Sequence, residues 1–460
     1  MDDMLLFWFL WALTAFFCLY TLANAILNPK QLLTFSFVAT TAWLYFYVYM
    51  AYSAATELRE YITPKSFILG QAVALVSYGA VLIGSELSKR RIKNARPPNY
   101  DIQRVFKGGF FLMVVGVIGQ ISFYGHDTVD LHTSAYWYDL YEVAYPGAAV
   151  CLAVLARYPA MRTRTRYAAV IGFTLFMISP FVLNARRGPL FPLVITCTFI
   201  PYLARRESPS RVAIASALVG VGAIMLAFLP IRHVMEVRDG YTYQYSLSKE
   251  RADIWIEGLS ELSFDNVFGS RTATLGDNEY AYHCGTITTL VETGRYQYGT
   301  GYLTLLTHWI PHELWPDKPS LQAGFYPSVY DVIPDVMGWG MTNGASAGGV
   351  ANVVEQLGIL FPLFWVVIAQ FLDFLHKKCF AIDSLSNPVY FVGFLGGAHW
   401  LIAQGLGASL VPICFFVFPP FLVFRYAKRK SVRSRRSINW EPEASPAGGL
   451  PPTSHSKRLA

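Results

Sequence analysis

Apolar runs of about 20 residues recur along this chain, and they constrain its fold more than any other feature. A run of that length is what an α-helix needs to cross the hydrocarbon core of a bilayer. Only 15% of the residues are charged, whereas an average soluble protein has about 25%. Because only a helix satisfies its own backbone within lipid over such a length, the runs predict an all-α, polytopic bundle of membrane helices.

We predict about eleven spans (10–12), with a range because several runs are short or adjoin one another. The predicted spans cover residues 4–27, 31–55, 66–84, 108–125, 141–157, 167–184, 188–204, 211–231, 352–375, 388–403 and 408–424.

Basic residues gather in connectors that fall on one side of this predicted bundle. They occupy the connectors 89–107, 162–166 and 205–211 and the tail after Tyr426. The positive-inside rule places these connectors in the cytoplasm. The amino terminus and the segment 232–350 then lie outside. That segment holds seven Lys or Arg and fourteen Asp or Glu, so it is net acidic.

The order of the spans divides the chain into four parts. Residues 1–231 hold the first eight spans, 232–350 form a large outer loop with short helices, and 351–424 hold the last three spans. Residues 425–460 form a basic tail that we expect to be disordered, because it is rich in Pro, Ser and Gly. Within the loop, "SLSKERADIWIEGLSEL" has apolar residues at roughly helical spacing opposite charged ones. This pattern predicts a helix on the membrane surface.

The cysteines and histidines do not predict a metal site. The six cysteines lack metal-ligand spacing and indicate no disulfide framework. His308 and His312 lie four residues apart, but Pro311 between them disfavours the helix that would bring them together. "HELWP" also lacks the second histidine of H-E-x-x-H. We therefore expect no metal and no cofactor.

The stretch "WIPHELWPDKPS", residues 309–320, is unusual in so apolar a chain. Its three prolines prevent a continuous helix and favour extended backbone before each of them. Trp309 and Trp315 are typical of a membrane–water boundary, where the indole ring is buried and its N–H is hydrated. The stretch is thus predicted to be a rigid interfacial segment, and His308, His312 and Lys318 add polar groups to it.

Together with its surroundings, this stretch resembles the Wzy-type O-antigen polymerases, which are oligosaccharide repeat-unit polymerases. "IPHELWPDKPS" is preceded by "GTGY" and followed by "VVEQLGILFPLF". Members of the family typically show I-P-R-x-hydrophobic-W-P-x-K-P and then a glutamate with a following glycine that opens the next membrane helix, here Glu355 and Gly358. His312 stands where arginine is frequent in the family. The amino half of the chain is similar to the family only in hydropathy.

The resemblance implies a membrane glycosyltransferase that works at the periplasmic face of a bacterial inner membrane. Such an enzyme moves a growing glycan from undecaprenyl pyrophosphate onto the next lipid-linked repeat unit. The 232–350 segment would then be a periplasmic loop. The expected partners are undecaprenyl-pyrophosphate-linked oligosaccharides and the lipid bilayer, with a chain-length regulator and a flippase as further candidates. No nucleic acid is expected.

In such a reaction, cations must stabilise the lipid diphosphate as it leaves, and a base must accept the proton of the attacking sugar hydroxyl. Bidentate guanidinium contacts suit a phosphate. Structural alternatives are headgroup contact for the "NARRGPL" pair and an ion pair with Asp277 or Glu279 for Arg271. The candidate pyrophosphate-binding residues are Arg186, Arg187, Arg232, Arg271 and Lys318.

For the base, His308, His312 and Glu355 are the candidates, with His283 as a further histidine in the loop. Histidine titrates in the useful pH range. Ionisable groups within a membrane span are costly and usually mark function. Glu355 lies near the outer end of such a span, and it is predicted to be a base, a sugar anchor or a helix partner.

Two other functions stay open. An O-antigen ligase, which transfers glycan to a lipid A core, has the same polytopic layout and a large late loop, and the W-P-x-K-P stretch favours polymerase over it. A flippase or other transporter of lipid-linked sugars predicts polar residues spread along the spans and short loops at both faces. Here the polar residues concentrate in one loop, which favours an enzyme.

Overall fold

The computed structural model describes most of the 460-residue chain. The described residues are 3–28, 31–88, 98–124, 140–178, 190–210, 212, 231, 234, 238, 249–261, 278–303, 307, 310, 314–317, 329–340 and 348–428. They belong to one compact unit, Met1–Lys428. The predicted disordered tail, 425–460, is wrong for residues 425–427, which end the last helix, and its part from Arg429 lies outside the described residues.

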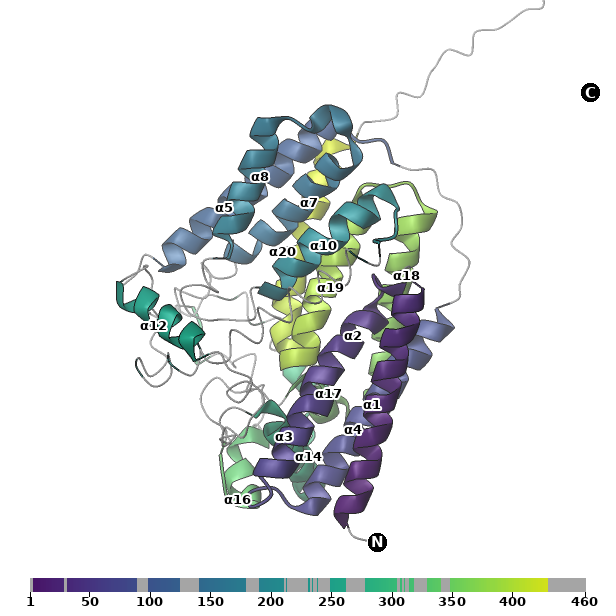
Figure 1. The fold of residues 1–460 in the computed structure, drawn as a ribbon, viewed down its shortest axis with the longest axis vertical. Coiled ribbons are helices and arrows are strands. Elements are labelled where there is room, and N and C mark those ends of the chain that lie inside the picture. Colours follow the sequence, from purple (N-terminus) through teal and green to yellow (C-terminus); the bar gives the residue numbers. More distant parts are fainter. Residues whose placement is uncertain are drawn as a thin grey trace, which may run out of the picture. The chain divides into compact units, whose positions relative to one another are not determined.

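The described residues form helices and no named strand (Figure 1). One isolated β-bridge joins Tyr100 to Lys428. Three-residue and four-residue 3₁₀ helices connect some of the larger elements: η3 (Pro159–Met161), η5 (Thr300–Leu303), η6 (Val329–Asp331) and η7 (Gly358–Leu360). The α-helices, with the π-helix η2 between α2 and α3, are α1 (Asp3–Leu27), α2 (Phe35–Trp43), η2 (Leu44–Tyr49), α3 (Met50–Glu57), α4 (Pro64–Leu87), α5 (Ile102–Tyr124), α7 (Ala144–Arg157), α8 (Arg164–Phe176), α10 (Leu190–Arg205), α12 (Lys249–Ser260), α14 (Glu279–Thr293), α16 (Ile333–Met337), α17 (Gly348–Leu357), α18 (Phe361–Ala381), α19 (Ser386–Gln404) and α20 (Leu406–Ala427).

Six of the described helical segments are long and apolar enough to cross a membrane, so the chain is a multi-pass membrane protein whose described part is helical. Helices also cover most of the predicted spans 31–55, 167–184, 188–204 and 388–403. These helices are shorter or less apolar than the six segments. The expectation of about eleven spans therefore stays a prediction. The six segments are Met4–Leu27, Pro64–Leu87, Ile102–Ser122, Leu140–Arg157, Gly348–Ala381 and Ser409–Ala427.

Close helix packing builds the core. In Figure 1, α4 runs alongside both α1 and α18, and α19 runs alongside α20. The closest approach is at Gly349 of α17, where a Cβ atom would lie 1.5 Å from the carbonyl oxygen of Leu401 in α19. Only glycine permits so close a contact between two backbones, as is common between membrane helices.

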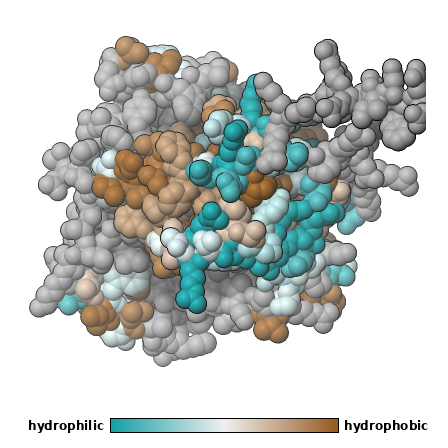
Figure 2. All heavy atoms as spheres, turned by 90° about the horizontal axis from the view of Figure 1, so that it is seen from above, coloured by the Kyte–Doolittle hydropathy of each residue, from teal (hydrophilic) through white to brown (hydrophobic). Residues whose placement is uncertain are grey.

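Arginines satisfy the carboxyl ends of two helices, α7 and α10, at one end of the bundle. Arg157 donates to the carbonyl of Ala204 over 3.0 Å, and its other nitrogen pairs with Asp383. Arg162 donates to Leu155 (2.8 Å) and Arg205 to Ala156 (3.2 Å). Cations are favourable at helix carboxyl ends, whose last carbonyls lack helical partners. We call this the arginine end; Figure 2 looks onto it and shows hydrophilic residues gathered there.

The segment expected to be an outer loop contributes a buried helix as well as a peripheral one. In α14, every residue from Tyr280 to Leu290 is buried, and the helix packs against α4 and α17. In α12, Ile254 of the predicted apolar face is buried, whereas Leu259 of the same face is 47% exposed. Ile254 packs in a small cluster with Ile231 and Val234. A position of α12 on the membrane surface stays a prediction.

Candidate functional site

One face of α17 carries three polar side chains in an otherwise apolar helix. Asn352, Glu355 and Gln356 stand at positions i, i+3 and i+4, which share a helical face. The Glu355 side chain is 0% exposed, so its carboxylate needs partners within the protein. It accepts hydrogen bonds from Gln297 Nε2 (3.1 Å), from Asn352 Nδ2 (3.4 Å) and from the backbone N–H of Val329.

The chain after α14 turns sharply and returns to α17. Gly294 ends α14 with a φ of 66°. Tyr298 and Gly299 follow with φ values of 47° and 84°, both in the left-handed region. Such residues are typical of tight turns, and glycine adopts this region without steric cost.

Four hydrogen bonds fasten this returning segment, residues 294–303, to α17. The backbone N–H of Gln297 donates to the Glu355 carbonyl (2.8 Å), and its side chain donates to the Glu355 carboxylate (3.1 Å). The backbone N–H of Gly301 donates to Gln356 Oε1 (3.1 Å), and Gln356 Nε2 donates to Gln297 Oε1 (3.2 Å). Both amide side chains thus use a donor and an acceptor, which defines their orientation.

Two tyrosines lie close enough to Glu355 for its carboxylate to affect the pKa of their hydroxyls. Burial raises the pKa of the Tyr330 hydroxyl, the Glu355 carboxylate raises it further, and a hydrogen bond with Asn352 opposes the rise. Burial and Glu355 likewise raise the pKa of Tyr302. Both hydroxyls therefore stay protonated at neutral pH. We call the whole group the Glu355 cluster: Gln297, Gly301, Tyr302, Tyr330, Asn352, Glu355 and Gln356.

His283, a further histidine considered as a base, lies inside the helix packing. Its Nε2 is 3.0 Å from the carbonyl oxygen of Gly70 in α4, and its ring lies 5.1 Å from that of Tyr47. Next to it, Tyr280 donates to Gln71 Oε1 (2.9 Å), and Gln71 donates to the Tyr47 carbonyl (3.2 Å). These contacts join α14 to α4 and to the π-helix, a helix type that is often found near functional sites.

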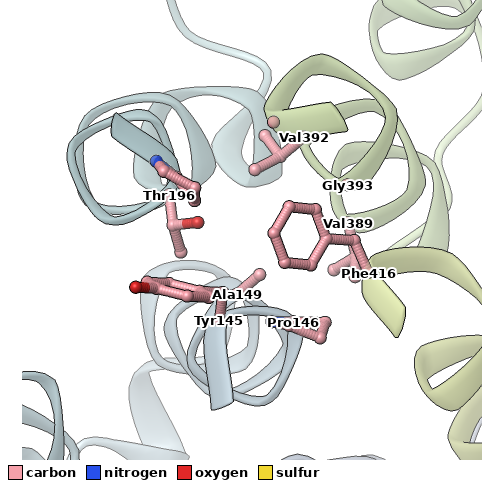
Figure 3. Close-up of a pocket in the computed structure, with 10 residues that line it drawn as sticks. Tyr145, Pro146, Ala149, Thr196, Val389, Val392, Gly393 and Phe416 are labelled. Carbon is pink, nitrogen blue, oxygen red and sulfur yellow. The ribbon is translucent and has the colours of Figure 1, made fainter. Parts of the chain in front are cut away.

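A small cavity lies on the other side of the bundle, between α7, α10, α19 and α20 (Figure 3). Tyr145, Thr196 and Phe416 line it together with small and apolar residues. Its volume is about 10 Å³, roughly the space that one water molecule needs. A sugar does not fit into a cavity of this size.

Most of the site residues predicted from the sequence lie outside the described residues. These are His308, His312, Arg186, Arg187, Arg232, Arg271 and Lys318. Glu355 is the predicted catalytic residue that the structure describes, and its role as a base stays a prediction. Arg238, a neighbour of Arg232 in the sequence, forms an ion pair with Glu257 of α12.

The sequence reasoning missed Gln297, Asn352 and Gln356, the amide partners of Glu355. The spacing of Asn352, Glu355 and Gln356 was a usable signal, because three polar residues at i, i+3 and i+4 interrupt an apolar helix. Gln297 had no comparable signal, since its partner stands 58 positions further along the chain.

The described residues include all six cysteines, and each of them is a free thiol. Among the described residues there is no group of three or more His, Cys, Asp or Glu side chains placed to hold a metal ion.

The comparisons with known proteins add no relative. No family model, no curated protein and no solved structure matches the chain. The fold and the site define the class, a multi-pass helical membrane protein with a buried, amide-bound carboxylate between α17 and the segment that follows α14.

Proposed function

We propose that this membrane protein polymerises undecaprenyl-pyrophosphate-linked oligosaccharide repeat units into O-antigen or a similar surface polysaccharide, at the periplasmic face of a bacterial inner membrane. One observation supports this most. The two parts of the family-like motif, "GTGY" at 299–302 and "VVEQLG" at 353–358, are hydrogen-bonded to each other through Gly301 and Gln356. Segments that resemble one family's motif at two distant places are expected to serve one site when they are in contact.

In the proposed reaction, an acceptor sugar hydroxyl attacks the anomeric carbon of the lipid-linked glycan, and the lipid pyrophosphate leaves. His308 or His312 takes the hydroxyl proton as general base. The pyrophosphate is held by cations, whose charge stabilises the leaving group as its bond breaks. The proposed cations are Arg186, Arg187, Arg232, Arg271 and Lys318.

Glu355 has a positioning role in this proposal besides its candidacy as a base. Its carboxylate binds the Gln297 side chain, and its carbonyl binds the Gln297 backbone. Gln297 lies eleven positions before His308. By fixing this segment to a membrane helix, Glu355 restricts where the following stretch can lie, and a catalytic group must be held to a fraction of an ångström.

Gene deletion and complementation test the proposal. Surface polysaccharide from the deletion strain is resolved by length on a gel, with the wild-type gene, Arg186→Ala and His312→Ala returned on a plasmid. We expect the ladder to collapse to core carrying a single repeat unit and the wild-type gene to restore it. Both variants should fail to restore it at a normal protein level.

Loss of all glycan from the core would overturn the proposal in favour of a ligase or a flippase. An unchanged ladder in the deletion strain would exclude every role in the synthesis of this polysaccharide.

A further inference from the structure

Two tyrosines flank the residue that fastens the returning segment to α17. Gln297 is buried and bonds to Glu355, while Tyr298 is 73% exposed and Tyr296 is half-buried. The ring centroids of Tyr296 and Tyr298 are 5.9 Å apart, with 49° between the ring planes. The buried amide therefore holds two aromatic rings beside each other at the protein surface.

The backbone at Tyr298 is in an uncommon conformation. Its φ is 47°, and a bulky side chain in this left-handed region is an outlier. Such a conformation persists only where the surrounding contacts impose it, and it is found preferentially at binding and catalytic sites. Here the hydrogen bonds of Gln297 on one side and of Gly301 on the other impose it.

The surface next to the tyrosine pair is apolar. Both rings lie over Gly358: a Cβ atom there would be 3.7 Å from Tyr298 and 3.8 Å from Tyr296. The next two residues, Ile359 and Leu360, are 91% and 58% exposed. They begin the segment that continues into α18, a membrane helix, so the pair stands where a lipid-facing surface meets the returning segment.

We propose that Tyr296 and Tyr298 form a stacking site for a sugar ring of the membrane-bound glycan. A pyranose ring has an apolar C–H face and a rim of hydroxyls, and tyrosine offers an apolar ring with a hydroxyl at its tip. Exposed Ile359 and Leu360 suit the polyprenyl chain that carries the glycan. The inference rests on the proposed function and names the part of the substrate that this segment binds.

A membrane anchor is the rival explanation, because tyrosines are enriched at membrane–water boundaries. An anchoring ring needs only to reach the headgroups, and a flexible backbone serves that purpose. At Tyr298 the backbone is instead held in an unfavourable conformation by hydrogen bonds to a buried carboxylate and a buried amide. A rigid pair of rings is what a ligand of defined shape requires.

Binding of purified polysaccharide tests the inference. The probe is the surface polysaccharide of the same bacterium, labelled with a fluorophore at its reducing end, and the protein is held in lipid nanodiscs. We expect Tyr298→Ala to weaken binding about tenfold, since an aromatic contact of this kind contributes about one factor of ten. Tyr298→Phe keeps the ring and should stay within about threefold of the wild type.

Two further variants separate ring loss from misfolding. Tyr298→Gly removes the ring but suits a positive φ, so the segment keeps its conformation while binding should weaken as in Tyr298→Ala. Tyr426→Ala is the matched control, because Tyr426 is 71% exposed and lies at the arginine end, where its ring contacts Arg104. It should bind like the wild type.

The outcomes distinguish this inference from the proposed function. Equal binding by the wild type and Tyr298→Gly overturns the stacking site, and a ladder lost on gene deletion then still supports the polymerase. Unchanged binding with poorer retention of Tyr298→Gly in nanodiscs identifies a membrane anchor and also overturns the stacking site. An absence of binding by the wild type also overturns the stacking site. An unaltered ladder in the deletion strain would instead exclude the proposed function on which the inference rests.

Discussion

The side-chain amide of Gln297 lies 3.1 Å from the carboxylate of Glu355, although the two residues stand 58 positions apart in the chain. Through this bond the segment after α14 is fastened to α17 within a membrane protein. Because a buried polar group that loses its partner costs free energy, this contact helps to determine how the segment lies.

Replacing the carboxyl group of Glu355 by an amide should loosen the cluster. We expect Glu355→Gln to lower the free energy of unfolding by about 1–3 kcal/mol, because Gln297 and Asn352 donate to the two different oxygens of the carboxyl group and an amide places an NH₂ donor where one of these acceptors was. The midpoint of thermal unfolding in detergent measures the effect. Glu292→Gln is the control, since Glu292 pairs with Lys65 over 3.4 Å at an exposed site, where such a pair contributes only about 0–1 kcal/mol. Equal midpoints for the two variants would contradict the role given to Glu355.

A methyl group added at Gly301 should push apart the side-chain amides of Gln297 and Gln356. A Cβ atom there would lie 2.4 Å from Gln356 Nε2 and 2.7 Å from Gln297 Oε1. We expect Gly301→Ala to displace one amide and to speed hydrogen exchange of the backbone amides in 294–303 by about tenfold or more. In the control, Gly79→Ala, the Cβ meets nothing within 4 Å, so exchange in that segment should not change. Slow exchange in both variants would show that the amide contacts do not hold the segment.

At the arginine end, Arg157 joins three parts of the chain. It belongs to α7, donates to Ala204 of α10 and pairs with Asp383 between α18 and α19. Lysine has one nitrogen and cannot reach both partners in a fixed fork. We expect Arg157→Lys to destabilise the protein by about 1–2 kcal/mol in a denaturant titration. The control is Arg164→Lys at the exposed start of α8; an equal loss there would mean that the fork of Arg157 is unimportant.

The predicted orientation has a direct labelling test. By the positive-inside rule, the connector that holds Arg164 faces the cytoplasm, and Arg295 then lies outside. Both residues are exposed. We expect a membrane-impermeant maleimide to label Arg295→Cys in cells whose outer membrane is permeabilised, and Arg164→Cys only after lysis of the inner membrane. The unsubstituted chain is the control for its six native cysteines. The reverse labelling pattern would invert the topology.

Much of the fold was predictable because hydropathy is a local property. The long apolar runs at 4–27, 66–84 and 408–424 became membrane helices near the expected bounds. The helix α14 lies in the segment predicted to be an outer loop with short helices, and its threonines, tyrosines and histidine lower its hydropathy. Some of its polar groups meet partners on other helices. Tyr280 contacts Gln71, and Asn278 at its amino-terminal cap contacts the Met50 carbonyl.

The sequence by itself determined the class of this protein: a helical membrane protein with one polar region late in the chain, and Glu355 as an unusual charge within a span. Only the tertiary structure decided what Glu355 binds and where Tyr296 and Tyr298 stand. The physical reason is that burial of apolar helices follows from composition over a single stretch of chain. A hydrogen bond between Gln297 and Glu355 depends instead on how two distant segments pack, and no periodicity in either segment encodes the other.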